Sequence, residues 1–556
     1  LFEPDKMKSR KDFDKWYNKQ KILHDEEFNN VIAKKYNITP KTKEYDFDKE
    51  LNEYCESDVR ILTKSMEVFR DSMKKLTDGL DPLQCVTIAS YCMKVFLTNH
   101  VPTEKELDGE IEEERNEQSG ISILKKEDYN TMKRGFFGGR TEVFKLYKKW
   151  SNKDVKQGRY GKYVDIVSLY PTSQFLDYLP YGQPKHYVFN EGDEVDINNY
   201  FGMIRCDIVC PKNLHIPLLG GKQVTPDGTE KFQFGLNDMK DVVYSSEELK
   251  KALTLGYKIT RVYEIYHFKK SKELFKSYIR TFMKGKVCGG GHSGTYEEKV
   301  KYCEEYKIKY GIDIKPEELV KNSGLKAVSK LCLNSLWGKF GQRQMAEDKY
   351  MNADEWFKLK KRYDNDEVDI LDRQDLGDAI YVKFQEKKDL KTSLRKTNVA
   401  ICAMLTANAR LRLYEELEKL NERVCYCDTD SIIYEYDESK YNVKMGKLLG
   451  DWEAEGEEDH KITEFCGIAP KAYSYKLKGE KSYEIKSKGI RMTEENKRLV
   501  TFDSYKKLID SQKIIKVDKM DFKKSKNGIQ TIHSKKDIAF DPQQFKRQII
   551  NKYETL

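Results

Sequence analysis

No apolar run in the 556-residue sequence approaches the roughly 20 residues that a membrane-spanning helix requires, so we expect no membrane partner. The twelve cysteines show no regular spacing, several lie within apolar runs, and no secretory signal precedes them. This usage is typical of reduced thiols and argues against a disulfide framework. Cys206, Cys210 and His215 are spaced like the start of a zinc site, but no fourth ligand follows at a suitable distance. These absences predict a soluble intracellular protein, without deciding between nucleus, cytoplasm and organelle.

Length and charge indicate several domains and a basic C-terminal part. A chain of 556 residues is too long for a single hydrophobic core. Its formal charge is +9, and residues 476–556 hold the whole excess, with 21 Lys and Arg against 11 Asp and Glu. A basic segment suits an enzyme that binds a polyanion, although charge alone is consistent with any soluble protein.

Two carboxylates one residue apart interrupt an apolar, β-prone run at residues 424–434, which read V-C-Y-C-D-T-D-S-I-I-Y. The flanking residues predict a buried hairpin with the acids at its turn. Residues two apart on an extended chain point the same way, so Asp428 and Asp430 are expected to face a common point, where Mg²⁺ would suit them. An ordinary Asp-rich turn is the alternative.

Two further stretches accompany the paired acids. Residues 163–171 read Y-V-D-I-V-S-L-Y-P, a β-rich run that ends in a Tyr-Pro break and carries Asp165 near its end. Residues 325–342 predict a helix with two faces at 100° per residue. Its polar face would carry Lys326, Lys330, Asn334 and Trp337, and its apolar face Leu325, Val328, Cys332 and Leu336. Such a polar face offers cations to a polyphosphate and a flat ring to a base, unless it is simply a solvated basic surface.

Together the three stretches resemble the motifs of family B DNA polymerases, which read D-x-x-S-L-Y-P, K-x-x-x-N-S-x-Y-G and Y-x-D-T-D-S. Residues 165–171, 330–338 and 426–431 supply them in that order, with Trp337 where the family usually has Tyr. Three more segments look like Y-x-G-G, T-x-x-A-R and K-x-Y, at residues 136–139, 406–410 and 471–473. These accompany the protein-primed branch found in phages, linear plasmids and Polinton or Maverick transposons. The sequence around Trp337 most resembles that of the eukaryotic transposon and virus members.

The resemblance implies an α+β fold arranged as a right hand, with palm, fingers and thumb. The expected parts are a truncated 3′–5′ exonuclease-like domain (1–100), an acidic linker (101–130), palm (131–185), palm with a first insertion (186–310), fingers (311–344), a second insertion (345–396), palm (397–492) and thumb (493–556). Within the first insertion, residues 245–248 predict a capped helix start and residues 257–268 a strand. The second insertion predicts a charged helix and a hairpin that turns near Gly377 and Asp378.

The resemblance also implies the roles of individual residues. Asp165 and Asp430 would be catalytic and, with the carbonyl of Ile166, would bind two Mg²⁺ ions, for which Mn²⁺ could substitute; Asp428 would serve local geometry more than metal binding. The nucleotide-binding residues would be Ser168, Leu169, Tyr170, Lys321, Lys330, Asn334 and Trp337. Contacts with the DNA primer-template would come from Phe136, Gly138, Gly139, Arg140, Thr406, Arg410, Lys471 and Tyr473. Thr406 has a purely structural role as its alternative.

Tyr54 and Asp58 match the third exonuclease motif of the family, Y-x-x-x-D, on a predicted helix that runs to Phe69. The first two exonuclease motifs have no counterpart in residues 1–53. The sequence begins at Leu1 without an initiator Met, and we expect the natural start to lie upstream. One acid cannot hold two metal ions, so we interpret Tyr54 and Asp58 as a remnant without 3′–5′ exonuclease activity here.

The resemblance therefore implies a DNA-directed DNA polymerase that joins dNTPs to a primer by two-metal phosphoryl transfer. The two insertions favour initiation on a terminal protein, in a mobile element, virus or linear plasmid. An oligonucleotide-primed replicase and a catalytically silent DNA-binding relic are the alternatives. The intact residues Asp165, Lys330, Asp428 and Asp430 argue against the relic.

Overall fold

The computed structural model describes residues 47–108, 120–224, 230–235, 237–342, 347–365, 367–375, 379–386, 397–456, 460–479, 483–525, 528–540, 547 and 553–555. The chain divides into two compact units, residues 1–83 and 84–556. Each unit is described by itself below.

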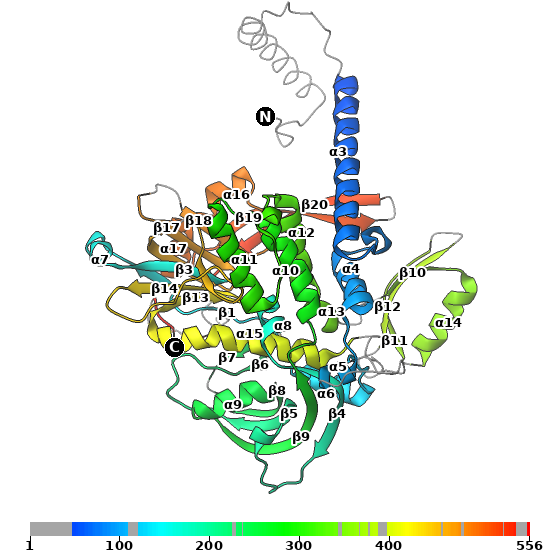
Figure 1. Ribbon diagram of the computed structural model, residues 1–556, viewed down its shortest axis with the longest axis horizontal. Helices are drawn as coiled ribbons and strands as arrows, with labels where there is room; N and C mark the ends of the chain where they lie inside the picture. Colours follow the sequence, from blue (N-terminus) through cyan, green and yellow to red (C-terminus); the bar gives the residue numbers. More distant parts are fainter. Residues whose placement is uncertain are drawn as a thin grey trace, which may run out of the picture. The chain divides into compact units, whose positions relative to one another are not determined.

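The largest sheet of the second unit has nine antiparallel strands (Figure 1). Its order is β1-β13-β14-β3-β16-β17-β18, with β15 paired to β3 and β2 to β16. The strands are β1 (Thr141–Val143), β2 (Tyr147–Lys149), β3 (Arg159–Ile166), β13 (Val424–Asp428), β14 (Ser431–Asp437), β15 (Trp452–Ala454), β16 (Ile462–Ala469), β17 (Ala472–Leu477) and β18 (Tyr483–Ser487). The predicted hairpin at residues 424–434 is confirmed as β13 and β14.

Helices cover both faces of this sheet because its apolar residues alternate between two cores. Ile432 and Tyr434 share one core with the long helix α15 (Val399–Leu420). Ile433, which points to the opposite face, shares the other core with α17 (Phe502–Ser511). The alternation fixes the register of β14, and with it the position of the turn that carries the acids.

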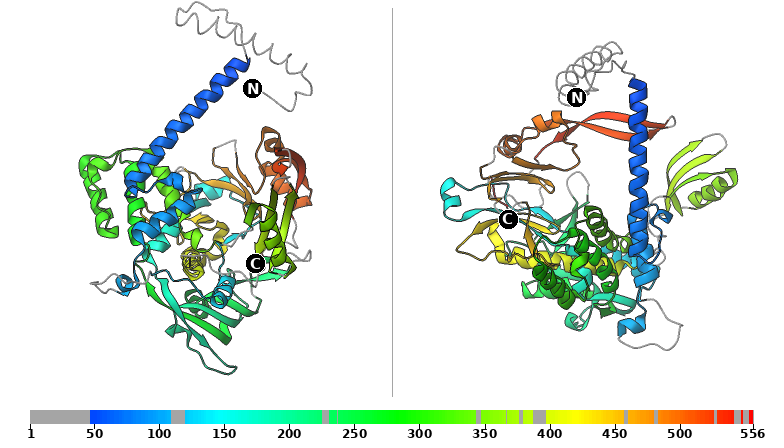
Figure 2. Two further views of the ribbon diagram at one scale, coloured as in Figure 1. Left: turned by 90° about the vertical axis from the view of Figure 1, so that its right-hand side faces the viewer. Right: turned by 45° about the horizontal axis from the view of Figure 1, so that its top comes forward.

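A group of helices packs beside the sheet. Helices α10 (Lys276–Gly290) and α12 (Ser323–Ser335) lie side by side in Figures 1 and 2. Gly289 permits their close approach, since a Cβ added there would lie 2.7 Å from the backbone nitrogen of Lys326. The other members are α4 (Ile88–Val95), the π-helical turn η4 (Phe96–His100), α8 (Leu169–Leu176), α11 (Tyr296–Tyr310), the turn η6 (Pro316–Glu318) and α13 (Trp337–Phe340). The group includes the predicted helix at residues 325–342 and helices on both sides of residues 100 and 310.

The first insertion contains its own four-stranded sheet, of order β4-β9-β5-β8. Its elements are β4 (Leu179–Val188), η5 (Ile197–Asn199), β5 (Gly202–Val209), the hairpin β6 (Gly220–Val224) and β7 (Glu230–Phe234), β8 (Met239–Ser245), α9 (Ser246–Thr254) and β9 (Lys258–Ser271). The Ser245 side chain accepts a hydrogen bond from the backbone N–H of Glu248, as the capping pattern predicts. The expected helix and the following strand are both confirmed.

The second insertion forms a three-stranded sheet, of order β10-β12-β11, with one helix. Its elements are β10 (Glu347–Met351), α14 (Ala353–Asp364), β11 (Val368–Asp375) and β12 (Ile380–Glu386). Strands β11 and β12 pair antiparallel, which confirms the predicted hairpin. Its turn at Gly377 and Asp378 lies outside the described residues. Strand β10 is an addition that the sequence did not predict.

The basic C-terminal part contains α16 (Glu494–Leu499), α17, and a long hairpin of β19 (Ile515–Ser525) and β20 (Gly528–Ile538) (Figure 2). The remaining short elements of this unit are α5 (Glu104–Asp108), α6 (Lys126–Arg134), α7 (Asn152–Lys156) and η8 (Asn421–Arg423). None of the helices in the described ranges is both long and apolar enough to cross a membrane.

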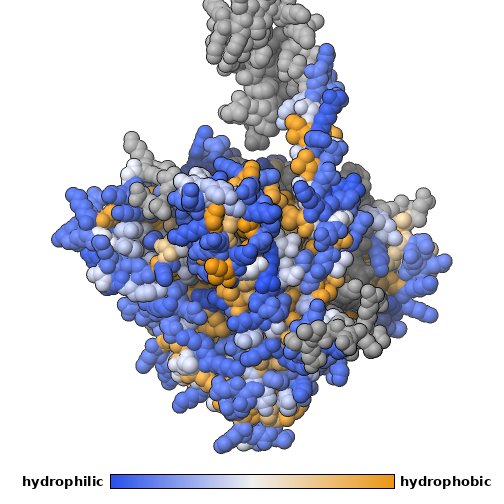
Figure 3. Space-filling view, in the orientation of Figure 1, coloured by the Kyte–Doolittle hydropathy of each residue, from blue (hydrophilic) through white to orange (hydrophobic). Residues whose placement is uncertain are grey.

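The described part of the first unit consists mainly of the helix α3 (Phe47–Leu76), which ends before the turn η3 (Pro82–Gln84). The predicted helix through residues 54–69 is confirmed, and Tyr54 and Asp58 are both exposed on it. Apolar side chains, among them Val59 and Leu62, are exposed as well, and Figure 3 shows orange patches along this helix.

Candidate active site

The pairing of β3 with β14 brings together two acids that lie far apart in the sequence, Asp165 on β3 and Asp430 just before β14. Asp165 is opposite Ser431 in the register, and the backbone N–H of Ile166 donates a 2.7 Å hydrogen bond to the carbonyl of Asp430. Asp165 and Asp430 therefore line one cavity of about 240 Å³. Its wall also includes Ile166, Val167, Ser168, Leu169, Tyr170, Lys286, Lys330, Asn334, Trp337 and Glu453.

The electrostatics of the two acids favour a bound cation. Burial, and after it the nearby charge of Asp430, raise the pKa of Asp165 to about 7. Burial is also the largest cause of the raised pKa of Asp430. Within the described residues, no cluster of three or more acidic, histidine or cysteine side chains suits a metal. Two carboxylates beside open space fit Mg²⁺, which completes its coordination with water and substrate phosphates.

Asp428 does not join the other two acids at the cavity. Thr429 between them has a left-handed backbone, with φ of 59°, so the extended-chain geometry expected from the sequence does not hold at this turn. Asp428 instead accepts a 2.8 Å hydrogen bond from the Thr141 hydroxyl and lies 3.1 Å from the Lys471 ammonium. These contacts tie the hairpin to neighbouring segments.

The helix at residues 325–342 presents three of the four residues of the predicted polar face to the cavity, and the fourth, Lys326, does not line it. Lys330, Asn334 and Trp337 line it, while Cys332 and Leu336 on the opposite face are fully buried. The helix is interrupted at Leu336, where α12 gives way to α13. The ring of Trp337 stacks on that of Tyr170, with 4.1 Å between centroids and 27° between planes.

Sequence reasoning missed two charged residues of the cavity. Glu453 is directly opposite Asp165 on the short strand β15. Lys286, on α10, donates a 2.8 Å hydrogen bond from Nζ to the Ser168 hydroxyl. A three-residue strand gives no periodic signal, and Lys286 lies 118 positions from its partner, so neither had a local signature. Lys321, by contrast, does not line this cavity.

The glycine-containing loop at residues 136–139 joins α6 to β1 and is held from beneath by Arg410. Gly138 and Gly139 are exposed, and Phe136 is half-buried. Arg410 donates hydrogen bonds of 2.7 and 3.0 Å to the carbonyls of Phe137 and Gly138, and its guanidinium lies 2.8 Å from Glu248. The predicted DNA contact by Arg410 is therefore corrected: its side chain is buried and supports the loop.

Three other predicted DNA contacts are also buried. Arg140 pairs with buried Glu142, and Thr406 is fully buried in α15, where its hydroxyl donates to the carbonyl of Ala403. The hydroxyl of Tyr473 lies 3.1 Å from that of Tyr163 in the core. Because these three side chains are buried, they cannot contact DNA directly and instead support the framework of the site. Lys471 keeps more than half of its side chain exposed.

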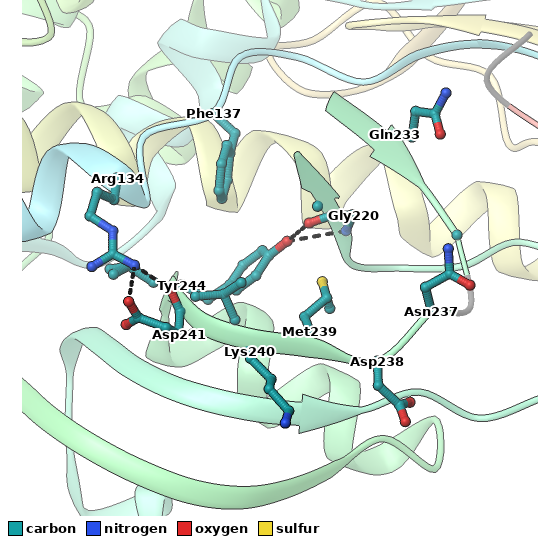
Figure 4. A pocket seen from close by; sticks show the side chains of 14 residues that line it. Arg134, Phe137, Gly220, Gln233, Asn237, Asp238, Met239, Lys240, Asp241 and Tyr244 are labelled. Atoms are coloured by element: carbon teal, nitrogen blue, oxygen red, sulfur yellow. Dashed lines mark hydrogen bonds and ion pairs between the residues drawn. The ribbon is translucent and has the colours of Figure 1, made fainter. Parts of the chain in front are cut away.

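A second cavity, of about 350 Å³, lies in the first insertion beside the same loop (Figure 4). Phe137, Met239 and Tyr244 point into it, and Arg134 pairs with Asp241 at 3.0 Å on its edge. The Tyr244 hydroxyl is hydrogen-bonded to the backbone of Gly220 and thereby fixes the β6–β7 hairpin. This cavity is larger than the one with the paired acids, but its two aspartates already have partners: Asp241 pairs with Arg134, and Asp238 accepts a hydrogen bond from the backbone N–H of Cys210.

The sequence matches a known protein family over most of its length. The family described as "DNA polymerase type B, organellar and viral" matches residues 6–288 and 292–422. The chain belongs to this family. Similar proteins include a probable DNA polymerase of Neurospora intermedia, 25% identical over 464 residues, and the DNA polymerase of Bacillus phage phi29, 23% identical over 412. The alignments cover 81% and 71% of this chain, but only 40% and 53% of those relatives.

The fold of a type B polymerase is confirmed by a solved structure. The phi29 DNA polymerase in complex with primer-template DNA and incoming nucleotides superimposes with a TM-score of 0.57 at 19% identity. The match covers 92% of this chain and 77% of that one. The α+β right-hand fold expected from the sequence is thereby confirmed.

Proposed function

We propose that this type B polymerase chain catalyses template-directed DNA synthesis from dNTPs. One observation carries the proposal: the β3–β14 pairing places Asp165 and Asp430 in the same cavity as Lys330. Lys330 could bind the negative phosphates of a nucleotide, while Asp165 and Asp430 could bind the metal that accompanies them. This arrangement of charges suits a metal-bound triphosphate. The nine-stranded sheet would be the palm, the helices around α12 the fingers, and the C-terminal basic part the thumb.

Each group in the cavity has a distinct role in this proposal. Asp165, Asp430 and the carbonyl of Ile166 would hold divalent metal, preferably two Mg²⁺ ions with Mn²⁺ as a substitute. When bound, the metal would lower the pKa of the primer hydroxyl and neutralise the leaving pyrophosphate. Lys330 would bind the triphosphate, and the stacked rings of Tyr170 and Trp337 would meet the sugar and base. Gly138, Gly139 and Lys471 are the exposed candidates for contacts with the DNA backbone.

Single substitutions of the acids test the proposal. Asp165→Ala and Asp430→Ala should each abolish Mg²⁺-dependent primer extension but leave duplex binding nearly unchanged, because these acids bind metal rather than phosphate. Glu297→Ala, at an exposed acid in the first turn of α11, is the matched control and should extend primers normally. Substantial extension by either Asp variant would refute the site. An inactive wild type would instead favour the DNA-binding relic.

Initiation on a terminal protein is the second part of the proposal, and the separate insertion sheet favours it. A folded primer protein needs a surface beside the palm. The β6–β7 hairpin lies next to the 136–139 loop, where the tilted rings of Phe137 and Phe232 are in contact, with 4.6 Å between centroids. The hydroxyl of a partner's Ser, Thr or Tyr would then receive the first nucleotide.

Shortening the β6–β7 hairpin tests the terminal-protein proposal. Initiation on a partner encoded nearby should fall more than extension of an annealed oligonucleotide. The deletion must end before α10, because a longer one would also remove Lys286 from the active-site cavity. Equal loss of both activities, or no protein–nucleotide adduct, would favour an oligonucleotide-primed replicase.

A further inference from the structure

Arg547 is a buried arginine that the proposed function does not use. Its side chain is 1% exposed, and its Nη1 lies 3.8 Å from the carboxylate of Glu142, which is not exposed at all. Glu142 already has a closer partner, because the Arg140 Nε donates a 2.6 Å hydrogen bond to the other oxygen of the same carboxylate. Two buried guanidinium groups therefore share one acid. Burial lowers the pKa of Arg547, since removing a cation from water is costly.

The other contacts of Arg547 join three segments of the chain. Its Nη2 donates a 2.7 Å hydrogen bond to the carbonyl of His215 in the first insertion, and its Nε donates one of 3.1 Å to the Thr555 hydroxyl. That hydroxyl donates in turn to the carbonyl of Phe144, and the guanidinium lies 4.6 Å from the centre of the Phe144 ring. Phe144 directly follows β1, and its N–H donates a 2.8 Å hydrogen bond to Cys425 in β13. Arg547 thus holds a residue that is itself bonded to the acid hairpin.

Strand β1 connects these contacts to the turn between the paired acids. Glu142 is the middle residue of this three-residue strand, which pairs with β13. Just before the strand, the carbonyl of Arg140 accepts a 2.7 Å hydrogen bond from the Thr429 N–H. At its first residue, the Thr141 hydroxyl donates a 2.8 Å hydrogen bond to Asp428. A shift of β1 would therefore move the turn that precedes β14.

We propose that Arg547 is a positioning residue for the turn at residues 428–430: it holds Glu142 and the segment after β1, and through them it keeps Asp430 at the metal-binding cavity. This inference rests on the polymerase function proposed above. Arg140 neutralises Glu142 without help, so charge balance does not require Arg547. Its planar group of donors instead fixes three segments in one geometry. A residue that only stabilised the fold would leave the local order of the turn and the metal affinity of the folded protein unchanged.

Hydrogen exchange of the metal-free chain tests this role without any measurement of activity. In Arg547→Met, the peptide that contains Thr429 should exchange about 3- to 10-fold faster, which corresponds to the weakening of one hydrogen bond. Peptides from β17 and β18, at the opposite edge of the same sheet, should exchange as in the wild type. Unchanged exchange at Thr429, or an equal increase throughout the sheet, would overturn the proposal.

Metal affinity provides a second measurement. Mn²⁺ binding to the complex with a dideoxy-terminated primer-template and dNTP should weaken about 10-fold in Arg547→Met, an effect typical of losing a residue that orients a metal ligand. The Kd for primer-template, and the KM for dNTP at saturating Mg²⁺, should stay the same. An unchanged affinity for Mn²⁺ would refute the positioning role.

Arg547→Lys separates geometry from charge, and it replaces Arg547→Met if that variant does not fold. Lysine keeps the charge but lacks the planar group of donors that spans Glu142, His215 and Thr555. It should show both changes to a smaller extent. Wild-type behaviour in Arg547→Lys would mean that charge alone is sufficient, and the geometric role would be wrong.

Glu554→Gln is the matched control. Glu554 lies beside Thr555, is half-exposed, and pairs with Lys145 at 3.7 Å. Its replacement should leave both measurements as in the wild type. Changes equal to those of Arg547→Met would show that docking of residues 553–555, rather than Arg547, orders the turn. If the wild type incorporates no nucleotide, the polymerase proposal fails, whereas the exchange of the Thr429 peptide still decides whether Arg547 orders the turn.

Discussion

Replacing Arg410 with methionine should destabilise the protein before it weakens any direct contact with DNA. The guanidinium is 6% exposed, pairs with Glu248, which is 3% exposed, and donates to the carbonyls of Phe137 and Gly138. Removing one partner of a buried ion pair costs about 3–5 kcal/mol, because the other charge is left without compensation. We expect a loss of this size in the free energy of unfolding for Arg410→Met.

Urea unfolding of four proteins measures this loss. Arg410→Met is compared with the wild type, with Arg410→Met/Glu248→Met, and with Arg412→Met. The double variant should regain part of the stability, since it buries no isolated charge. Arg412, two positions on in α15, pairs with Asp177 in a more exposed setting, so its replacement should cost about 1 kcal/mol or less.

The affinity for primer-template, measured on the same variants, decides between the two roles of Arg410. If the side chain supports the 136–139 loop, DNA affinity should fall only in proportion to the loss of loop order, and the double variant should not restore it fully. If unfolding of Arg410→Met were unchanged and DNA affinity alone fell, the buried role would be refuted. Arg410 would then be the DNA contact that the sequence motif implies.

Three further predictions follow from the same geometry. Tyr170→Val should raise ribonucleotide incorporation, because the ring that stacks on Trp337 would no longer clash with a 2′-hydroxyl; an unchanged ribo-to-deoxy ratio would place the gate elsewhere. In chelator, Asp165→Asn should raise the melting temperature more at pH 8 than at pH 5, since a folded-state pKa of about 7 makes the ionised acid destabilising as pH rises from about 4 to 7; equal shifts at both pH values would contradict this. The chain should not shorten mismatched 3′ ends, and Mg²⁺-dependent shortening that Asp58→Ala removes would show a working exonuclease.

The sequence predicted those parts of the site that are local in the chain. The β13–β14 hairpin, the polar face of α12 and the capped start of α9 each depend on residues within one element, whose spacing is visible in the sequence. On α12, the polar face carries Lys330 to the cavity, and the opposite, apolar face buries Cys332 in the core. Period and turn chemistry are sufficient for such features.

The parts that could not be predicted depend on contacts between distant segments. Arg410 and Lys286 look like any other basic residues, and their partners lie 162 and 118 positions away. Burial of an arginine depends on whether a carboxylate such as Glu248 meets it in the folded chain, which no local pattern reveals. The pattern at residues 406–410 is visible in the sequence, but the burial of Arg410 is not.

The backbone, rather than side-chain contacts, positions the two acids. Asp165 is held by strand pairing, and Asp430 by the bond from the Ile166 N–H to its carbonyl. The turn between Asp428 and Asp430 is fixed by a 2.7 Å hydrogen bond from the Thr429 N–H to the carbonyl of Arg140.

This backbone support has a consequence for metal binding. Burial and the neighbouring acids outweigh the charge of Lys330, which acts to lower the pKa of Asp165. By contrast, the Thr141 hydroxyl and the Lys471 ammonium engage Asp428 directly. An acid that the protein buries without a donor keeps its oxygens available for a cation from solution. Under the proposed function, the β13–β14 hairpin would supply Asp428 for structure and Asp430 for metal, with the left-handed residue Thr429 between them.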